Sequence, residues 1–347
     1  MIELDFFNVI QKAWQEYDPS RQIASIVDIS ARVSTNHVFA VKFVNNDLII
    51  AKCSYYGKFK HFKEDHTIIN VLATTLPPPY ENLLARSLTK DNEVYTCRYK
   101  DGDFDAWAVF YYPITIQNKL PRQLTEFHIK KLGEELARFH MACHEVKHTL
   151  PKASKTLKTD IDTLKKFIDS EEGKAEYGPH VNFIDEQCDI FLQNSAALKY
   201  EDFSAIPVFV DWNIGNFSVT EDITFFSRWD YDWFRVASRI LDFYFFSRVS
   251  STAGDRTVFS YLADPLMEDR FMVFLKAYHK IYPLTEAEVL FMKEAYRFFI
   301  INYVIKDGRY FFHQVYAKRL IREAYEIYFP MLDKTFRAEK ILKALKI

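Results

Sequence analysis

The chain has 347 residues, of which 49% are hydrophobic, and a formal net charge of −2. This length and apolar content suit two domains or one domain of two lobes, and they exclude wholesale disorder. The nearly balanced charge argues against a protein that mainly coats nucleic acid. Four cysteines without a CxxC pair indicate free thiols in a reducing compartment. With an acidic N-terminus and no long apolar run, the cytoplasm is the expected location.

The first third of the chain mixes strand and helix patterns. Residues 1–20 are expected to form an amphipathic helix, because Phe6, Ile10 and Trp14 recur at four-residue steps. A second helix is expected over 63–76, where a run of three prolines ends it. Alternating or continuous apolar patterns predict strands at 23–29, 37–43, 48–53, 94–99 and 107–112.

After a break between Pro113 and Pro121 the sequence becomes almost wholly helical. Helices are expected at 125–144, 156–170, 185–201, 235–250, 267–281, 286–306 and 312–328. Only the block 206–230 interrupts them with strands. The layout predicts an α+β fold of two lobes, an antiparallel sheet with one helix over residues 1–113 and a helical lobe over 114–347. A cleft between two lobes is a usual place for a ligand.

The most informative polar residues follow a short apolar strand at 206–210. Asp211 comes directly after it, Asn216 lies five residues later, and Asp230 follows the hairpin pattern at 217–226. Phosphoryl transfer from a nucleotide requires a carboxylate that orients the attacking hydroxyl, and amide and carboxylate oxygens that hold magnesium. The sequence therefore predicts phosphorylation of a small molecule, with Asp211 as catalytic base and Asn216 and Asp230 as metal ligands.

A lysine ends the apolar strand at 48–53. In nucleotide kinases such a strand lysine holds the phosphates and pairs with a glutamate of the next helix. Lys52 is expected in this role with Glu64 as partner, and Asp65 is the alternate partner. The competing interpretation is a surface lysine on an edge strand.

A short polar segment between the first two expected strands is a candidate phosphate-covering loop. It holds Ser34, Thr35 and Asn36 and contains no glycine, so neither GxGxxG nor a P-loop is present. Small polar side chains still leave backbone N–H groups free to bind phosphate. An ordinary polar hairpin turn explains the segment equally well.

Several stretches resemble the aminoglycoside phosphotransferase-like kinases, which include choline, homoserine-type and fructosamine kinases. Residues 132–140, LGEELARFH, are very similar to their Leu-Gly-x-x-Leu-Ala-x-Leu-His helix. DWNIGN at 211–216 resembles their catalytic loop, and WDYD at 229–232 resembles their metal segment. Asp242 falls where their downstream structural aspartate lies. The resemblance spans roughly residues 25–305 and is most specific in these middle motifs.

This resemblance implies a bilobal protein-kinase-like fold and an ATP-dependent phosphotransferase that acts on a hydroxyl of a small metabolite or antibiotic-like acceptor. It implies ATP and Mg²⁺ as cofactors, Asp232 as a further metal ligand and Asp242 as a brace of the catalytic loop. The implied partners are a nucleotide and a small acceptor, with no nucleic acid and no membrane. The segment implied to offer backbone groups to adenine includes Tyr111, Tyr112 and Ile114.

Two positions depart from the family pattern. Phe209 stands where the family has a histidine that braces the catalytic loop, and Arg228 stands two residues before Asp230. A cation there repels a metal ion unless a partner such as Asp232 neutralises it. An alternative is therefore a catalytically weak or inactive kinase-fold binding protein. A third is an unrelated helical protein whose motif residues do not converge in space.

The nature of the acceptor stays open. Arg235 and Arg239 lie one helical turn apart in the expected helix and fit a carboxylate or phosphate group. Salt bridges explain them more simply, with Asp232, Asp242 or Asp255 as expected partners. Four aromatic residues equally suit a cationic acceptor through their ring faces: Trp229, Tyr231, Trp233 and Phe234.

Overall fold

The computed structural model describes residues 5–30, 37–102, 104–252 and 260–347. The candidate phosphate-covering residues Ser34, Thr35 and Asn36 therefore lie outside the described residues. Within those ranges, each helix is too short or too polar to cross a membrane.

A five-stranded antiparallel sheet forms the N-terminal lobe, with the strand order β1-β2-β3-β7-β6. Its strands are β1 (Ile23–Asp28), β2 (His37–Phe43), β3 (Leu48–Ser54), β6 (Thr96–Asp101) and β7 (Phe104–Tyr111). A separate two-stranded ribbon consists of β4 (Thr89–Lys90) and β5 (Glu93–Val94). Lys52 pairs with Val38 on one side and Val109 on the other, so it lies in the central strand. The alternative of a lysine on an edge strand is wrong.

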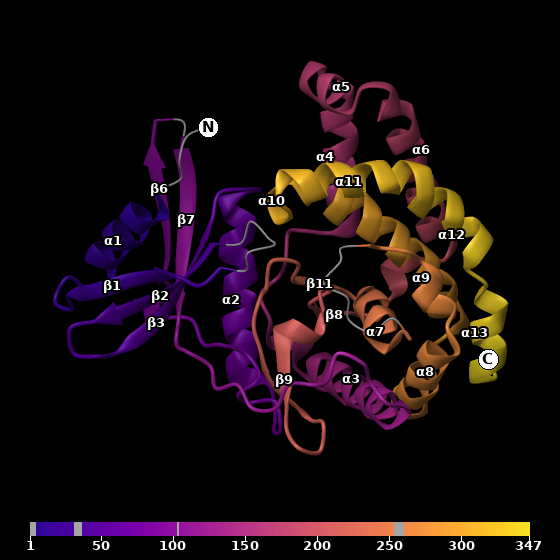
Figure 1. Ribbon diagram of the computed structural model, residues 1–347, viewed down its shortest axis with the longest axis horizontal. Coiled ribbons are helices and arrows are strands. Elements are labelled where there is room, and N and C mark those ends of the chain that lie inside the picture. The colour runs from indigo at the N-terminus through magenta and orange to yellow at the C-terminus, as the bar shows by residue number, and fades with distance from the viewer. Residues whose placement is uncertain (1–4, 31–36, 103, 253–259) are drawn as a thin grey trace.

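Helix α1 (Phe6–Tyr17) covers the face of this sheet that is turned away from the helical lobe (Figure 1). Its buried residues Phe6, Ile10 and Trp14 join a core with the inward side chains of the strands. Helix α2 (Phe59–Thr75) lies on the other side, toward the helical lobe (Figure 1). Its apolar residues belong to the large core of that lobe, so α2 joins the two halves of the molecule.

The C-terminal lobe is almost wholly helical. Its helices are α3 (Glu126–Val146), α4 (Leu157–Asp169), α5 (Glu171–Tyr177), α6 (Val181–Ala197), α7 (Phe243–Ser250), α8 (Asp269–Ile281), α9 (Glu286–Phe299), α10 (Gly308–Phe311), α11 (Gln314–Glu323), α12 (Phe329–Thr335) and α13 (Ala338–Leu345). Helix α9 continues as the π-helical turn η7 (Ile300–Lys306), and α11 continues as η8 (Ala324–Tyr328). A side chain at Gly133 would place its Cβ only 2.4 Å from the Phe274 carbonyl oxygen, so this glycine permits the close crossing of α3 and α8.

In its described part, the helical lobe contains four short strands: β8 (Ala205–Val208), β9 (Phe217–Val219), β10 (Phe225–Arg228) and β11 (Arg235–Ser238). The expected hairpin is confirmed by the antiparallel pairing of β9 with β10. The helix expected over 235–250 is wrong in its first half, because Arg235–Ser238 pairs with β8 and a 3₁₀ turn, η5 (Arg239–Asp242), precedes α7. Pairing with a distant strand overrides the local helical pattern there. The α+β fold with an N-terminal antiparallel sheet and a helical C-terminal lobe is confirmed.

Candidate active site

The loop that carries Asp211 leaves β8 through a strained bend. Val210 has a φ of 63°, a left-handed conformation that β-branched residues rarely adopt. The buried Asp242 holds this bend, because its Oδ1 accepts hydrogen bonds from the backbone N–H groups of Phe209 at 2.9 Å and Val210 at 2.7 Å. The structural role implied for Asp242 is therefore confirmed.

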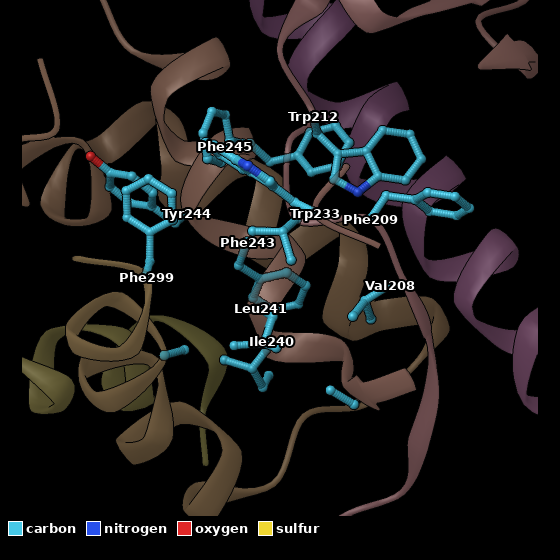
Figure 2. Close-up of a cluster of buried hydrophobic side chains, with 14 of the residues drawn as sticks. Val208, Phe209, Trp212, Trp233, Ile240, Leu241, Phe243, Tyr244, Phe245 and Phe299 are labelled. Carbon is cyan, nitrogen blue, oxygen red and sulfur yellow. The ribbon is translucent and has the colours of Figure 1, made fainter. Parts of the chain in front are cut away.

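Asp242 is itself fixed from the opposite side. Its Oδ2 lies 3.0 Å from Nε2 of His140 on α3, and Nδ1 of His140 lies 2.8 Å from the Tyr278 hydroxyl on α8. Apolar side chains of the loop, among them Phe209 and Trp212, lie close to those of β8 and α7, such as Val208 and Phe245 (Figure 2). A rigid core thus positions the loop that carries Asp211.

The three residues expected to converge do lie together. The Asn216 Nδ2 donates to the Asp211 carbonyl oxygen at 3.4 Å, and the Trp229 N–H donates to the Asn216 carbonyl oxygen at 3.0 Å. Asp230 follows Trp229, and burial together with the negative charge of Asp230 raises the pKa of Asp211. The β9–β10 hairpin brings these groups back to the loop, as its sequence pattern predicted. The alternative of an unrelated protein with scattered motif residues is wrong.

Lys52 reaches across from the sheet to the same place. Its Nζ lies 2.5 Å from Asp232 Oδ1 and 3.6 Å from Asp230 Oδ1. Burial alone would lower the pKa of Lys52, but the two carboxylates outweigh burial and raise it. The strand lysine is therefore charged and directly contacts the candidate metal segment.

The expected ion pair between Lys52 and Glu64 is not formed. Glu64 instead accepts hydrogen bonds from Ser154, at 3.1 Å from its N–H and 2.6 Å from its hydroxyl. Asp65, the alternate partner, pairs with Lys155. Both carboxylates point from α2 toward the segment before α4. The packing of α2 against this segment determines their partners, and the spacing of charges in the sequence does not reveal it.

Arg228 lies behind the loop that carries Asp211 and also contacts the first residue of the candidate metal segment. Its fully buried guanidinium stacks 4.4 Å from the ring centroid of Phe209 and 4.7 Å from that of Trp212. Its Nη2 donates to the Asp211 carbonyl oxygen at 2.9 Å, and its Nη1 to that of Trp229 at 3.2 Å. The two departures from the family pattern, Phe209 and Arg228, therefore contact each other, and the arginine braces the loop.

The oxygens at this place fit a magnesium ion. The buried Oδ2 of Asp232 has no hydrogen-bond partner in the described part of the chain, and an ion would use this free acceptor. Asn216 and Asp230 supply the amide and carboxylate oxygens that Mg²⁺ prefers. No cluster of three or more His, Cys, Asp or Glu suited to a metal occurs among the described residues. The donor set thus resembles sites where substrate phosphates and water complete the coordination.

The carboxyl group of Asp211 has the properties of a proton acceptor. Burial, helped by the negative charge of Asp230, raises its pKa to about 7. The Asn213 N–H, which donates to Asp211 Oδ1 at 3.1 Å, and the cation of Arg228 oppose this rise. A general base works best when its pKa lies near the working pH.

The segment expected to contact adenine lies at the end of β7. The Tyr112 N–H already donates to the Arg86 carbonyl oxygen at 3.0 Å, so it is engaged within the protein. The Tyr111 hydroxyl contacts Nδ1 of the buried His66 on α2, and Ile114 packs against the main core. Contact of this segment with adenine stays a prediction.

Some residues of the site gave no signal in the sequence. The Tyr231 hydroxyl accepts from the Ala85 N–H at 2.9 Å and donates to the Arg228 carbonyl oxygen at 2.8 Å, which ties the metal segment to the loop after α2. His66 faces Lys52, and burial followed by this positive charge lowers its pKa well below the usual value. Only packing between distant segments creates these contacts.

The two arginines considered as acceptor clamps form salt bridges instead. Arg235 Nη2 lies 2.7 Å from Asp160 Oδ2, and Arg239 Nε lies 2.7 Å from Glu288 Oε1. Salt bridges are therefore confirmed for both, but these partners are not the aspartates expected at 232 and 242. The third expected partner, Asp255, lies outside the described residues.

No family model and no curated protein matches this sequence. Solved structures do match it over nearly its whole length. An amicoumacin kinase in complex with AMP-PNP and Ca²⁺ has 14% identity and a TM-score of 0.64, with 97% of each chain covered. A microcompartment-associated aminopropanol kinase has 14% identity and a TM-score of 0.61, covering 96% of this chain and 99% of that one. The gentamicin complex of APH(2")-IIa has 12% identity and a TM-score of 0.54, with 98% and 99% covered.

At these identities the likeness establishes the architecture. Both lobes and their order along the chain correspond, because the matches cover almost all of each protein. The chain thus has the bilobal kinase fold that aminoglycoside phosphotransferases share with other small-molecule kinases.

Proposed function

We propose that this protein is a small-molecule kinase that transfers the γ-phosphoryl group of ATP to a hydroxyl of its acceptor in the presence of Mg²⁺. The observation that carries the proposal is the meeting of Asp211, Asn216 and Asp230 beneath the charged Lys52. A position between two lobes is a usual one for a ligand, which supports the proposal. The cytoplasm, where ATP is available, is the proposed location.

Each group has a distinct task in this reaction. Asp211 orients the acceptor hydroxyl and takes its proton while the hydroxyl oxygen bonds to the γ-phosphorus and the bond to ADP breaks. Lys52 binds the nucleotide phosphates. Asn216, Asp230 and Asp232 would hold Mg²⁺, whose charge neutralises the phosphates. Arg228 fixes the Asp211 backbone, so the carboxylate meets the hydroxyl in a defined geometry.

The structural neighbours support a small alcohol as acceptor. The names of two of them specify amicoumacin and aminopropanol, and a third binds gentamicin. No contact in the described residues favours the alternative of an inactive binding protein. Its motivation was Phe209, Arg228 and the small number of glycines, and Arg228 stacks on Phe209 behind the loop.

The test is an ATP-turnover screen with Mg²⁺ and candidate alcohols such as aminopropanol, choline, homoserine, sugars and aminoglycosides. Asp211→Asn should lower kcat by roughly 10²–10⁴-fold, the usual contribution of a general base, and leave ATP affinity nearly unchanged. Asp222→Asn, in the exposed turn of the β9–β10 hairpin, is the matched control and should retain full activity. Equal turnover in the two variants would remove Asp211 from the mechanism.

A further inference from the structure

The segment that leads into α4 contacts both helix α2 and the backbone next to the candidate metal segment. Lys155 of this segment donates hydrogen bonds to two acceptors, a carboxylate oxygen of Asp65 on α2 and the carbonyl oxygen of Phe234 at 2.8 Å. The side chains of Lys155 and Asp65 are only 14% and 15% exposed. A single ammonium group of the helical lobe thus links α2 to the backbone that follows Asp232.

The Phe234 carbonyl group belongs to the same turn as Asp232. The Phe234 N–H donates to the Tyr231 carbonyl oxygen at 3.0 Å, so residues 231–234 form a tight turn that contains Asp232. The hydrogen bond from Lys155 to the Phe234 carbonyl oxygen therefore restrains the backbone that carries this candidate metal ligand.

The link between α2 and this turn stands in place of a contact that the structure lacks. In protein kinases the strand lysine pairs with a glutamate of the following helix, and this pair must be in place for catalysis. Here Lys52 contacts Asp232 at 2.5 Å, and its expected pair with Glu64 is not formed. The position of α2 relative to the metal segment therefore depends on other contacts, and the contacts of Lys155 provide one.

The Asp65 end of this link is a largely buried ion pair. Burial raises the pKa of Asp65, and the positive charge of Lys155 opposes this rise. Removal of one partner from such a pair leaves the other without compensation, so the pair resists separation. It therefore holds α2 more firmly than the exposed hydrogen bonds between Ser154 and Glu64 do.

We propose that Lys155 is a positioning residue of the proposed kinase site, which fixes α2 against the turn 231–234. Asp232 of this turn and Lys52 then meet the metal and the phosphates in a defined geometry. The inference rests on the proposed kinase function. Lys155 acts through Asp65 and the backbone of the turn, in the way that outer residues orient the ligands of a metal.

The experiment measures how strongly Mg²⁺ improves nucleotide binding by the full chain. Calorimetry gives the Kd of AMP-PNP in EDTA and in Mg²⁺, and the ratio of the two values reports the metal. Lys155→Met keeps an unbranched side chain but loses the ammonium group. This variant should lower the ratio about 10-fold, the usual effect of an outer residue on metal affinity. Its Kd in EDTA should stay within about 2-fold of the wild type.

Two further variants separate positioning from stability. Lys155→Arg keeps the charge and the donors, and the cavity of about 610 Å³ that Lys155 lines has room for the longer side chain, so most of the ratio should return. Lys158→Met is the matched control, since Lys158 is an exposed lysine of α4 that pairs with Asp162 at 2.6 Å, and it should leave the ratio unchanged. Circular dichroism verifies that each variant is folded.

The ratio compares two conditions of one variant, so a loss of stability alone does not change it. An unchanged ratio in Lys155→Met, an equal fall in Lys158→Met, or a ratio in Lys155→Arg as low as that in Lys155→Met would each overturn the role of Lys155. The kinase proposal would survive these results as long as Mg²⁺ tightens binding to the wild type. A wild type that gains nothing from Mg²⁺ would overturn both proposals.

Discussion

The charges around Asp211 determine when this residue can act as a base. Burial and Asp230 hold its pKa at about 7, so at neutral pH the free protein carries both protonation states. A magnesium ion on Asp230 would offset the negative charge that raises this pKa. We therefore expect Asp211 to lose its proton when the nucleotide and the metal bind. The carboxylate is then able to accept the proton of the acceptor hydroxyl only when the phosphate donor is present.

Substitutions of Arg228 test this electrostatic account, because Arg228 both holds the Asp211 backbone in place and acts on its carboxylate through its positive charge. Arg228→Met removes a cation near Asp211, which disfavours the carboxylate form, so its pKa rises and the acid limb of kcat/KM moves to higher pH. Arg228→Lys keeps the charge and should leave the limb in place. Both variants lose the paired contacts to the loop, and kcat should fall about 10-fold or more.

The measurement is a pH–rate profile between about pH 5 and 9. Arg98→Met, at an exposed arginine of the sheet lobe that pairs with Asp105, is the control and should match the wild type. An acid limb that stays fixed in Arg228→Met, or that moves equally in Arg228→Lys, would show that the charge of Arg228 does not act on the base.

The loop that carries Asp211 depends for its shape on Asp242, which lies directly before α7. The strained bend at Val210 persists because the Asp242 carboxylate accepts hydrogen bonds from the N–H groups of Phe209 and Val210. His140 of α3 contacts the other oxygen of this carboxylate. Helices α3 and α7 and strand β8 therefore meet at a single buried side chain. Loss of this side chain should affect stability and catalysis together.

Asp242→Ala leaves two buried N–H groups unpaired, at a cost of about 1–3 kcal/mol each. The midpoint of thermal unfolding should fall by several degrees, by the usual ratio of about 2–4 °C per kcal/mol. Asp242→Asn keeps an oxygen that can accept from the two N–H groups, so its unfolding midpoint should fall less than that of Asp242→Ala. Asp222→Ala, on the exposed hairpin turn, is the control for calorimetric scans. An unfolding midpoint equal to that of the control would contradict the role of Asp242.

Local sequence patterns predict the elements whose contacts are local. The strand that carries Lys52 and the hairpin that returns Asp230 follow from apolar patterns and turn residues. The strand at Arg235–Ser238 was missed, because its partner β8 lies far away in the sequence. The partner of Lys52 was also missed, since the face that α2 presents depends on its packing against the segment before α4. The stacking of Arg228 on Phe209 likewise arises only in three dimensions.

Across the whole molecule, the candidate site is built from both lobes. Lys52 belongs to the sheet, whereas Asn216 and Asp230 belong to the helical lobe, so a bound nucleotide and metal would contact both. Direct contacts already join the lobes, including the stacking of Tyr56 on Tyr310. A ligand that bridges the lobes should make them unfold as one more stable unit.

ATP with Mg²⁺ should therefore raise the unfolding temperature. At a ligand concentration of about 100 Kd the gain is about 2.7 kcal/mol, which corresponds to a shift of several degrees. Asp230→Ala should lose the part of the shift that depends on Mg²⁺, and Lys52→Met should reduce the shift with ATP at any Mg²⁺ concentration. A thermal-shift titration with and without EDTA separates the two effects. Identical shifts in both variants and the wild type would contradict their placement.

The convergence of Asp211, Asn216 and Asp230 at a nucleotide-bound metal is the claim on which the kinase proposal depends. Its most direct test is a crystal structure with AMP-PNP and Mn²⁺, in which anomalous scattering locates the ion. We predict an anomalous peak coordinated by Asn216 and Asp230, with the Asp211 carboxylate free of the ion and facing the γ-phosphate. A manganese ion bound elsewhere, or a nucleotide bound away from Lys52 and Asp230, would contradict the account.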